Sequence, residues 1–418
     1  MSRHDIGPFA LDARTLLLMR EDEIVKIPMK TVEVLRALLE RRGEVVTKDE
    51  LMKAVWPDSI VEEANLTVHV ALLRKTLGAA AVIETIPKRG YRLVSEPPSS
   101  TETPADRASR EAVLRGRYLW NKFTQASLER AAAAFETALS ARADSGEAHS
   151  GLCDTRLMQG LFGFEPDRTV FRVAREHGER AASAAPDSVE AQASLAFSSL
   201  FDRFDFKTAE EALARARAVA PGRVEPHLWS ALFHGLRGEA LKAFAAAREA
   251  TTIDPVSPRT VVGSGFHLYL SQQYQPDLDP LLQSLELEPD LAIAHWALGL
   301  ACDKRGDFER AEQAHRAAVR HSGGSPTMES NLARSLALAG KRSEALMLAE
   351  KLGASGLAPY RLATISAALG ENEHAIRMIE RAWKERDPWL VVLKVDPMLD
   401  GIRGDPRVRV IEKEVLSG

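Results

Sequence analysis

The residues best suited to chemistry lie between Asn65 and Leu93, in a helical stretch followed closely by two strand-like runs. Apolar residues recur there at intervals of three and four and predict one buried stripe, formed by Leu66, Val70, Leu73 and Leu77. The same spacing predicts an outward-facing set, formed by Asn65, Thr67, Ala71, Arg74 and Lys75. A helix with such a face could contact the phosphates and base edges of double-stranded DNA.

The strand pair after this helix has a basic tip, within the sequence Ile83-Glu84-Thr85-Ile86-Pro87-Lys88-Arg89-Gly90-Tyr91-Arg92-Leu93. Arg74, Lys75, Lys88 and Arg89 supply mobile cations that suit phosphates. From residue 64 to residue 95 there are five basic residues and a single acid, Glu84. Positive charge therefore gathers at the helix and the hairpin, although the formal net charge of the chain is -4.

The length of 418 residues and the hydrophobic content of 45% are sufficient for at least two domains. Only two cysteines occur, Cys153 and Cys302, and each lies in an apolar helical pattern that predicts a buried free thiol. The first residues lack a signal-peptide core, and no apolar run approaches the roughly 20 residues that span a bilayer. We therefore expect a soluble, cytoplasmic protein without a membrane partner.

The sequence contains none of the common catalytic signatures. It lacks a glycine-rich phosphate loop, a metal-binding cluster and a nucleophile-elbow motif. The glycine pair Gly263-Ser264-Gly265 follows no buried strand and does not indicate nucleotide binding. We expect no cofactor, no metal and no enzymatic activity.

The segment before residue 65 predicts a small α+β domain over residues 1–96. Short runs at 9–11, 16–19 and 24–27 predict an antiparallel sheet. A helix capped by Thr31 should follow and end at Gly43, and a capping box formed by Thr47 and Glu50 should begin the next helix. Pro57 closes that second helix.

In this order the elements resemble the winged-helix output domain of OmpR/PhoB-type bacterial regulators, over about residues 9–95. The residues that carry the resemblance are Leu35, Leu38, Gly43, Val45, Thr47, Leu51, Val55, Trp56, Pro57, Asn65, Leu66, His69, Val70, Leu73, Arg74, Leu77, Thr85, Ile86, Gly90, Tyr91 and Arg92. The resemblance implies that the helix over 65–77 enters the major groove. It also implies that the hairpin over 83–93 touches the adjacent minor groove or the backbone, and that His69, Arg74 and Thr85 contact DNA, mostly at phosphates.

The sequence departs from this family at positions that matter for reading bases. Ala71 and Leu72 stand where family members often carry arginines that reach DNA, and Pro87 stands at another commonly basic position. Together with Val68, these residues make the expected base-reading face apolar. Such a face permits contact of Val68 or Ala71 with thymine methyl groups. The target sequence cannot be inferred from that of other family members.

Several of these residues also have a purely structural interpretation. His69 could be a half-buried side chain that packs on the first helix, and Arg74 could pair with Glu62 or Glu63. Tyr91 is interpreted as a core residue, because an aromatic side chain on the return strand of a hairpin usually anchors it. The basic tip could be an ordinary solvated turn.

The composition changes after the first domain. Residues 97–104, with the sequence Pro97-Pro98-Ser99-Ser100-Thr101-Glu102-Thr103-Pro104, have no apolar periodicity, so we expect a flexible linker over 97–109. From residue 110 onward alanine, leucine, arginine and glutamate dominate and loops are short, which is typical of a helical array.

The array has a period of 34 residues, seen in the spacing of Pro221, Pro255 and Pro289. Pairs of alanines seven residues apart recur with it: Ala209 and Ala216, Ala243 and Ala250, and Ala311 and Ala318. This is the spacing of tetratricopeptide (TPR) repeats, and it predicts an all-α superhelix over 110–390 with a C-terminal helical cap over 391–418. The stretch 162–169 is interpreted as an insertion in the second repeat.

The resemblance to tetratricopeptide proteins implies a concave face that binds peptide segments or partner proteins. Candidate groove residues are polar or aromatic positions of the first helices: His227, His234, His267, Tyr269, His295 and Asn331. The alternative is that the array is only a rigid scaffold or a dimer surface.

These features together predict a one-component bacterial transcription regulator. Its winged helix would bind double-stranded DNA, and its repeat array would receive a signal or bind a protein partner. A homodimer on DNA is one arrangement open to it. The alternative function is a protein-interaction scaffold whose winged helix no longer binds DNA, which the apolar Val68 and Leu72 would permit.

Overall fold

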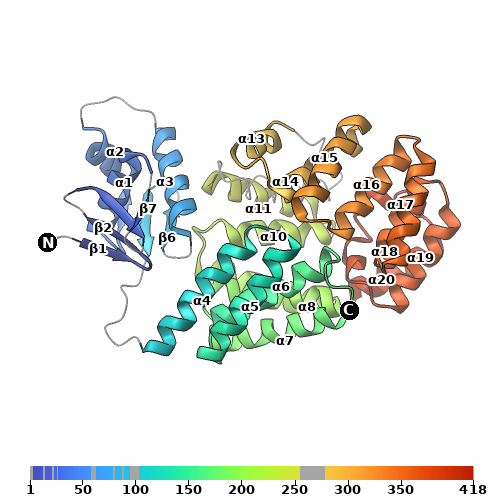
Figure 1. Cartoon of the computed structure of the whole chain (residues 1–418), viewed down its shortest axis with the longest axis horizontal. Helices are drawn as coiled ribbons and strands as arrows, with labels where there is room; N and C mark the ends of the chain where they lie inside the picture. The colour runs from blue at the N-terminus through green and yellow to red at the C-terminus, as the bar shows by residue number, and fades with distance from the viewer. Residues whose placement is uncertain are drawn as a thin grey trace. The chain divides into compact units, whose positions relative to one another are not determined.

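The computed structural model describes residues 3–12, 15–20, 23–25, 27–57, 63–78, 81–86, 89–94, 103–254 and 278–417. The chain divides into two compact units. The first consists of residues 1–104 with two short later stretches, and the second consists of the remaining chain. Figure 1 shows a first unit with strands and helices and a larger second unit that is helical where it is described. The expected order of an α+β domain followed by an all-α array is therefore confirmed.

The first unit contains two antiparallel sheets and three helices. The first sheet has the order β1 (Arg3–Ile6), β2 (Phe9–Asp12), β3 (Leu17–Arg20) and β4 (Glu23–Ile24). The helices are α1 (Met29–Glu40), α2 (Lys48–Val55) and α3 (Glu63–Leu77). The second sheet has the order β5 (Val45–Thr47), β7 (Gly90–Val94) and β6 (Val82–Ile86). Within this unit the four-stranded sheet and α3 lie on opposite sides (Figure 1).

Three of the four predicted helix signals are present, and one of them is Pro57, which follows the end of α2 at Val55. The capping box forms, because the Glu50 amide donates to Thr47 Oγ1 at 3.2 Å and the Thr47 amide donates to Glu50 Oε2 at 2.7 Å. Gly43 follows α1 with a φ of 83°, which is accessible to glycine at little cost. The predicted cap at Thr31 is wrong: α1 begins at Met29 without a side-chain cap, and Thr31 is fully buried inside the helix.

The core of the first unit is built from the three helices and from buried residues of both sheets. Leu66, Val70, Leu73 and Leu77 are at most 3% exposed, which confirms the predicted stripe of α3. They pack with buried residues of α1 and with Leu93 of β7. Full burial of each such side chain contributes roughly 1.5–3 kcal/mol. This packing holds α3 along one side only.

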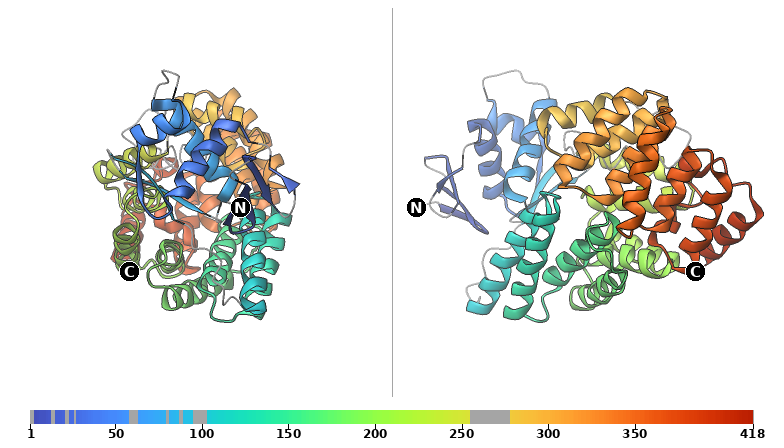
Figure 2. Two further views of the ribbon diagram at one scale, coloured as in Figure 1. Left: turned by 90° about the vertical axis from the view of Figure 1, so that its left-hand side faces the viewer. Right: turned by 45° about the vertical axis from the view of Figure 1, so that its right-hand side comes forward.

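The second unit consists of successive helix pairs (Figure 2). Its elements are α4 (Pro104–Trp120), α5 (Gln125–Ala141), α6 (Gly146–Leu161), α7 (Thr169–Ala184), α8 (Val189–Arg203), α9 (Phe206–Val219), α10 (Glu225–Leu236), α11 (Ala240–Ile253), α13 (Asp279–Leu287), α14 (Ala292–Arg305), α15 (Phe308–Ser322), α16 (Pro326–Leu338), α17 (Arg342–Ala354), α18 (Pro359–Ala368), α19 (Asn372–Lys384), the 3-10 turns η2 (Pro388–Val392) and η3 (Pro397–Leu399), and α20 (Pro406–Ser417). Helix α4 begins inside the stretch expected as linker, so residues 104–109 are helical rather than extended.

The helix pairs repeat the same packing. Helices α6 and α7, α8 and α9, α14 and α15, and α18 and α19 contact each other closely. The alanines predicted at the contacts are buried, and this includes Ala209, Ala216, Ala311 and Ala318. Gly306, Gly340 and Gly370 end the first helices of their pairs with φ near 77°, a conformation that favours glycine. The predicted tetratricopeptide-like repeat is therefore present in this unit.

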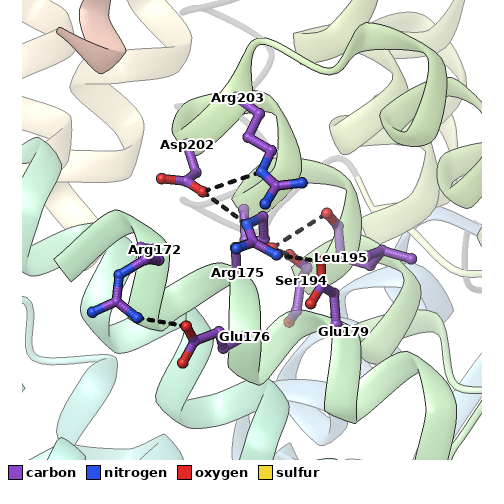
Figure 3. Close-up of polar contacts among 9 residues, drawn as sticks. Arg172, Arg175, Glu176, Glu179, Ser194, Leu195, Asp202 and Arg203 are labelled. Atoms are coloured by element: carbon purple, nitrogen blue, oxygen red, sulfur yellow. Dashed lines mark hydrogen bonds and ion pairs between the residues drawn. The ribbon is translucent and has the colours of Figure 1, made fainter. Parts of the chain in front are cut away.

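Ion pairs add to the packing of the second repeat against the third. Arg175 of α7 is 8% exposed and donates from Nε to Asp202 Oδ2 of α8 at 2.7 Å (Figure 3). The same guanidinium also pairs with Glu179 one turn further along α7. Because Arg175 is mostly buried and meets two carboxylates, it fixes the approach of these helices more firmly than an exposed ion pair would.

Candidate functional site

Helix α3 presents one face away from the core of the first unit. At 100° per residue, the side opposite the buried stripe consists of Val68, Ala71, Leu72 and Lys75, here called the outer face. Val68 is 49% exposed and Lys75 is exposed, whereas Ala71 and Leu72 are half-buried. The outer face is thus apolar except at Lys75. Asn65 is also exposed, near the start of the helix.

Arg74 does not face outward as predicted. Its guanidinium donates from Nε and Nη2 to the carbonyl of Ile83 at 3.0 and 2.6 Å, and from Nη2 to Thr85 Oγ1 at 2.9 Å. Both acceptors belong to β6, the first strand of the hairpin β6–β7, here called the wing. A guanidinium that forms several bonds to one strand holds that strand in a fixed position. Arg74 therefore ties the wing to α3.

The alternative ion pair between Arg74 and Glu63 does not form. Glu63 pairs instead with Lys48 at the start of α2. Lys48 shows a pKa raised above its ordinary value, first because of its hydrogen bond to Glu63. Glu62 lies outside the described residues.

Thr67 also lies toward the wing rather than outward. Its Oγ1 is 3.5 Å from the hydroxyl of Tyr91, and the Thr67 side chain is half-buried. Tyr91 itself is 3% exposed, which confirms its interpretation as a core residue. Sequence spacing placed Thr67 and Arg74 on the polar side of the helix, but the wing covers that side.

His69 is half-buried and contacts α1, as its structural interpretation predicts. Its Nδ1 lies 2.8 Å from Thr31 Oγ1, and its ring centroid is 5.4 Å from that of Trp56. Burial, and then the nearby charge of Lys30, lower the pKa of His69. The ring is therefore neutral at neutral pH. A hydroxyl that donates to Nδ1 leaves a proton on Nε2, which could still donate to a phosphate oxygen.

The wing is a regular antiparallel hairpin with Ile86 opposite Gly90. A Cβ on Gly90 would lie 2.0 Å from the carbonyl oxygen of Val46, so the approach of β5 to β7 requires glycine there. Arg92 bonds to Glu84 across the wing at 2.8 Å, which leaves Arg89 as an exposed cation beside the turn. The predicted contact Lys88 lies outside the described residues.

Two candidate groove residues of the array form hydrogen bonds to backbone carbonyl groups. His227 Nε2 is 2.9 Å from the carbonyl oxygen of Pro221, and His295 Nε2 is 2.8 Å from that of Pro289. Both carbonyls lie six residues earlier in the chain, in the loop that precedes the helix. Gln192 makes the equivalent bond to Pro186 at 2.8 Å. These side chains therefore tie repeat loops, and the recurring interval of six residues after proline was the sequence signal for that role.

Two other candidates are buried, and a buried side chain offers no contact to a partner. His234 is 9% exposed, and its Nδ1 is 2.7 Å from Glu239 Oε2. Asn331 is 1% exposed and donates to the carbonyl of Thr327 at 3.1 Å. The structure thus does not support the expectation for these two residues. His267 and Tyr269 lie outside the described residues.

The loop after α6, interpreted from the sequence as an insertion, joins early and late repeats of the array. The ring of Phe162 lies edge-on to Phe123 at 4.7 Å and 6.0 Å from the ring of Trp296 on α14. The carbonyl oxygen of Leu161 accepts a bond from Thr327 Oγ1 of α16 at 2.8 Å. The second repeat is therefore in contact with α14 and α16 through this loop and the end of α6.

Residues 388–402, here called the interior segment, add further contacts between distant repeats of the array. Leu390, Val391 and Leu393 are at most 1% exposed, and η2 contacts both α8 and α18. Trp389 donates from Nε1 to the carbonyl of Leu161 at 3.2 Å. The C-terminal part was expected to cap the last repeat, and α20 does contact α19. The interior segment reaches beyond that position and packs against the early repeats.

Two buried aspartates anchor the interior segment. Asp387 is fully buried and accepts bonds from the amides of Tyr360 at 2.9 Å and Trp389 at 3.1 Å. The hydroxyl of Tyr360 donates to Asp396 Oδ2 at 2.9 Å. Burial raises the pKa of Asp387 above its ordinary value. The apolar interior of the array is thus occupied by the chain itself.

Cys153 and Cys302 are buried free thiols, as predicted. Burial raises the pKa of Cys302 to about 11, so this thiol stays protonated at neutral pH. In the part of the chain that the structure describes, no three His, Cys, Asp or Glu groups gather as a metal would require. Within the same residues, no helix combines the length and the apolar character needed to cross a membrane.

Part of the first unit matches a known family of proteins. Residues 21–93 match the family described as "Transcriptional regulatory protein, C terminal". The transcriptional regulator HilA of Salmonella typhimurium is 38% identical over 94 residues, which are 21% of this chain and 17% of the relative. The sensory transduction protein BceR of Bacillus subtilis is 34% identical over 86 residues, which are 20% of this chain and 37% of the relative. The chain thus spans well under two thirds of these relatives.

Two solved structures are similar to this chain. A thermophilic TPR protein of Thermus thermophilus is 23% identical, with a TM-score of 0.38, over 46% of this chain and 98% of that one. Yeast Tom70 is 15% identical, with a TM-score of 0.42, over 93% of this chain and 85% of that one. The repeat assignment here rests on the helix pairs and their spacing.

Proposed function

We propose that this chain is a sequence-specific DNA-binding transcription regulator. The proposal is supported by a first unit of the OmpR/PhoB-type transcriptional regulatory family and by the array of tetratricopeptide-like helix pairs that follows it. Helix α3 lies in the major groove, and the wing lies on the adjacent minor groove or backbone. The array receives a signal or binds a protein partner. A homodimer on DNA is part of this proposal.

The observation that carries the proposal is the way α3 is mounted. Its buried stripe fixes one side to the core, Arg74 fixes the wing beside it, and the outer face remains for a ligand. The exposed cations Lys75 and Arg89 suit phosphate contacts on either side of that face. Asn65, Val68 and Ala71 would then meet base edges.

We propose smaller or indirect roles for the remaining candidates. Arg74 and Thr85 position the wing, and Thr67 supports it beside Tyr91. His69 can offer its Nε2 proton to a phosphate while Thr31 holds the ring. Lys88 remains a proposed phosphate contact on the strength of its place in the sequence.

The salt dependence of DNA affinity tests the phosphate contacts. For the full chain, the logarithm of affinity should fall linearly with the logarithm of salt concentration, and each phosphate contact contributes about 0.9 to the slope. The double variant Lys75→Ala, Arg89→Ala should flatten the slope by about 1.8. The matched control is Arg20→Ala, which removes an exposed cation from β3 of the sheet opposite α3.

Two results would overturn this proposal. One is affinity that does not change with salt. The other is a double variant whose slope equals that of the control. If both variants unfold at the same temperature as the original chain, neither result can be attributed to loss of the fold.

The alternative is a protein-interaction scaffold, favoured by the 49% exposure of Val68 on a face that is apolar except at Lys75. Exposed apolar patches commonly mark protein contacts. A scaffold of this kind would bind all DNA duplexes equally weakly and would prefer no sequence. Sequence preference therefore separates the two functions.

The interior of the repeat array is less accessible to a partner than the groove of an open superhelix would be. The interior segment already occupies that space, so a protein partner must either use the outer surface or displace residues 388–402. We propose the outer surface as the partner site. Cross-linking of a bound partner to residues of the second helices, such as α15 or α17, would support this, and cross-links to α8 and α18 alone would contradict it.

A further inference from the structure

We propose that α3 reads DNA mainly through the methyl groups of thymine, with Val68 and Ala71 as the contacting residues. The target would be a major-groove site rich in A·T pairs whose thymine methyls face the helix. This inference rests on the proposed function, because it requires α3 to lie in the major groove. It names the class of DNA that this site prefers.

The outer face of α3 has the shape and the chemistry to contact thymine methyl groups. Val68, Ala71, Leu72 and Lys75 follow one another along one side of α3. Val68 is 49% exposed, and the neighbouring Ala71 is small enough to let the helix approach base edges closely. The 5-methyl of thymine is the apolar group that the major groove displays.

Three polar side chains near the outer face contact other parts of the first unit, and the fourth, Lys75, is the proposed phosphate contact. Arg74 bonds the carbonyl of Ile83 and the hydroxyl of Thr85. His69 meets Thr31, and Thr67 lies beside Tyr91. The bidentate contacts by which arginine reads guanine are therefore not available from Arg74 without release of the wing. Asn65 is exposed at the start of α3 and suits one adenine, which agrees with an A·T-rich site.

Base pairs that present guanine or cytosine would lose affinity against this face. Guanine presents two acceptors in the major groove, and cytosine presents an amino donor. Pressed against Val68 or Leu72, these groups would lose water without gaining a hydrogen-bond partner, which lowers affinity. A thymine methyl in the same place gains affinity through burial. Each buried methyl is worth about fourfold in affinity, the equivalent of roughly 0.8 kcal/mol.

Replacement of thymine by uracil tests the inference, because the two bases differ only in the 5-methyl group. The full chain is bound to its preferred duplex, selected from random DNA, and uracil is placed at one thymine position at a time. We expect about fourfold weaker binding at each of two or three positions and no change at the others. Cytosine at such a position should weaken binding, and 5-methylcytosine should recover part of the loss.

The variants Val68→Ala and Asn65→Ala assign the effect to a residue. In Val68→Ala the uracil penalty should fall to less than twofold at one position and stay at the others. In Asn65→Ala overall affinity should fall, whereas every uracil penalty should remain. Val68 is exposed, so Val68→Ala should unfold at the same temperature as the original chain, which excludes misfolding as the cause.

Failure of this inference can be told apart from failure of the proposed function. A reproducible preferred sequence with no uracil penalty at any position would overturn methyl readout and leave the transcription regulator intact. Enrichment of G·C-rich sequences would overturn it as well. Binding that shows no preferred sequence would remove the proposed function itself.

Discussion

The outer face of α3 and the interior of the repeat array are both apolar, but they differ in what covers them. Val68 on α3 is 49% exposed, and its neighbours Ala71 and Leu72 on the outer face are only half-buried. In the array, Leu390 and Leu393 of the interior segment are at most 1% exposed. An apolar surface covered by its own chain contributes to stability, whereas one left open is available to a ligand.

This difference changes where ligands are expected. Tetratricopeptide spacing alone suggests an inner groove as the partner site, but Phe162 and the interior segment occupy it. The open apolar face lies instead on the helix that should read DNA. Substitutions in the interior should therefore change stability, and substitutions around α3 should change binding.

The largest effect is expected from Trp389→Ala in the interior segment. The variant loses a buried ring, its bond to Leu161 and its contact with the Arg361 guanidinium, which lies 4.5 Å from the ring. Truncation of such a side chain costs roughly 3–5 kcal/mol. Denaturant unfolding should show this loss for the array, with Val410→Ala on the exposed side of α20 as control. A loss below about 1 kcal/mol, as for surface changes, would mean that the interior is not closed.

A pH effect should come from the histidine pair between α6 and α7. His149 and His177 approach within 2.8 Å between their Nδ1 atoms. Burial, and then the charge of His149, lower the pKa of His177 to about 4 from its ordinary 6.5. The folded chain thus takes up this proton less readily than the unfolded chain, so the stability is present above pH 6.5 and is lost as pH falls toward 4.

The expected loss over this range is about 2 kcal/mol, after allowance for the solvent that reaches the half-buried ring. Unfolding free energies at several pH values would measure it, and His177→Gln should flatten the profile between these limits. An equally steep profile in that variant would assign the effect to other groups. DNA affinity should not follow the same profile, because neither histidine lies in the first unit.

Around α3, Arg74→Ala should weaken DNA binding about tenfold, the equivalent of ~1.4 kcal/mol. The physical reason is loss of wing position. Because the wing itself carries the proposed phosphate contacts Lys88 and Arg89, the salt slope is compared in chains that already carry Lys88→Ala and Arg89→Ala, where Arg74→Ala should leave it unchanged. Lys75→Ala gives the contrast, because a lost phosphate contact lowers the slope by about 0.9. If Arg74→Ala lowers the slope as much as Lys75→Ala does, Arg74 is itself a phosphate contact.

The smallest effect is expected from the repeat loops. His295→Ala removes the bond to the carbonyl of Pro289 and should cost about 1 kcal/mol of array stability. His295→Gln should retain most of that stability, because Gln192 makes the equivalent bond in another repeat. Equal losses in the two variants would show that the bond itself contributes little.

The repeated and local features of the fold were predictable from the sequence. The three-and-four spacing of leucines and valines gave the buried stripe of α3, and the 34-residue period gave the helix pairs, because both patterns are set within one or two turns of chain. The capping box at Thr47 was predictable for the same reason. The outer face was correctly expected to be apolar.

Features that depend on distant parts of the chain were not predictable. Arg74 and Thr67 were expected to face outward because the spacing within a helix does not show that a later hairpin covers that side. The roles of Leu161 and Phe162 depend on residues far later in the chain, such as Trp296 and Trp389. Helical spacing could not distinguish an apolar segment that caps the last repeat from one that fills the interior.

The measurement that tests the central claim most directly is selection of bound sequences from random DNA by the full chain at a fixed, physiological salt concentration. We expect strong enrichment of a single A·T-rich motif by the original chain. The variant Lys75→Ala should select the same motif with weaker affinity. Equal recovery of all sequences, without an enriched motif, would contradict the claim that α3 and the wing form a sequence-reading DNA site.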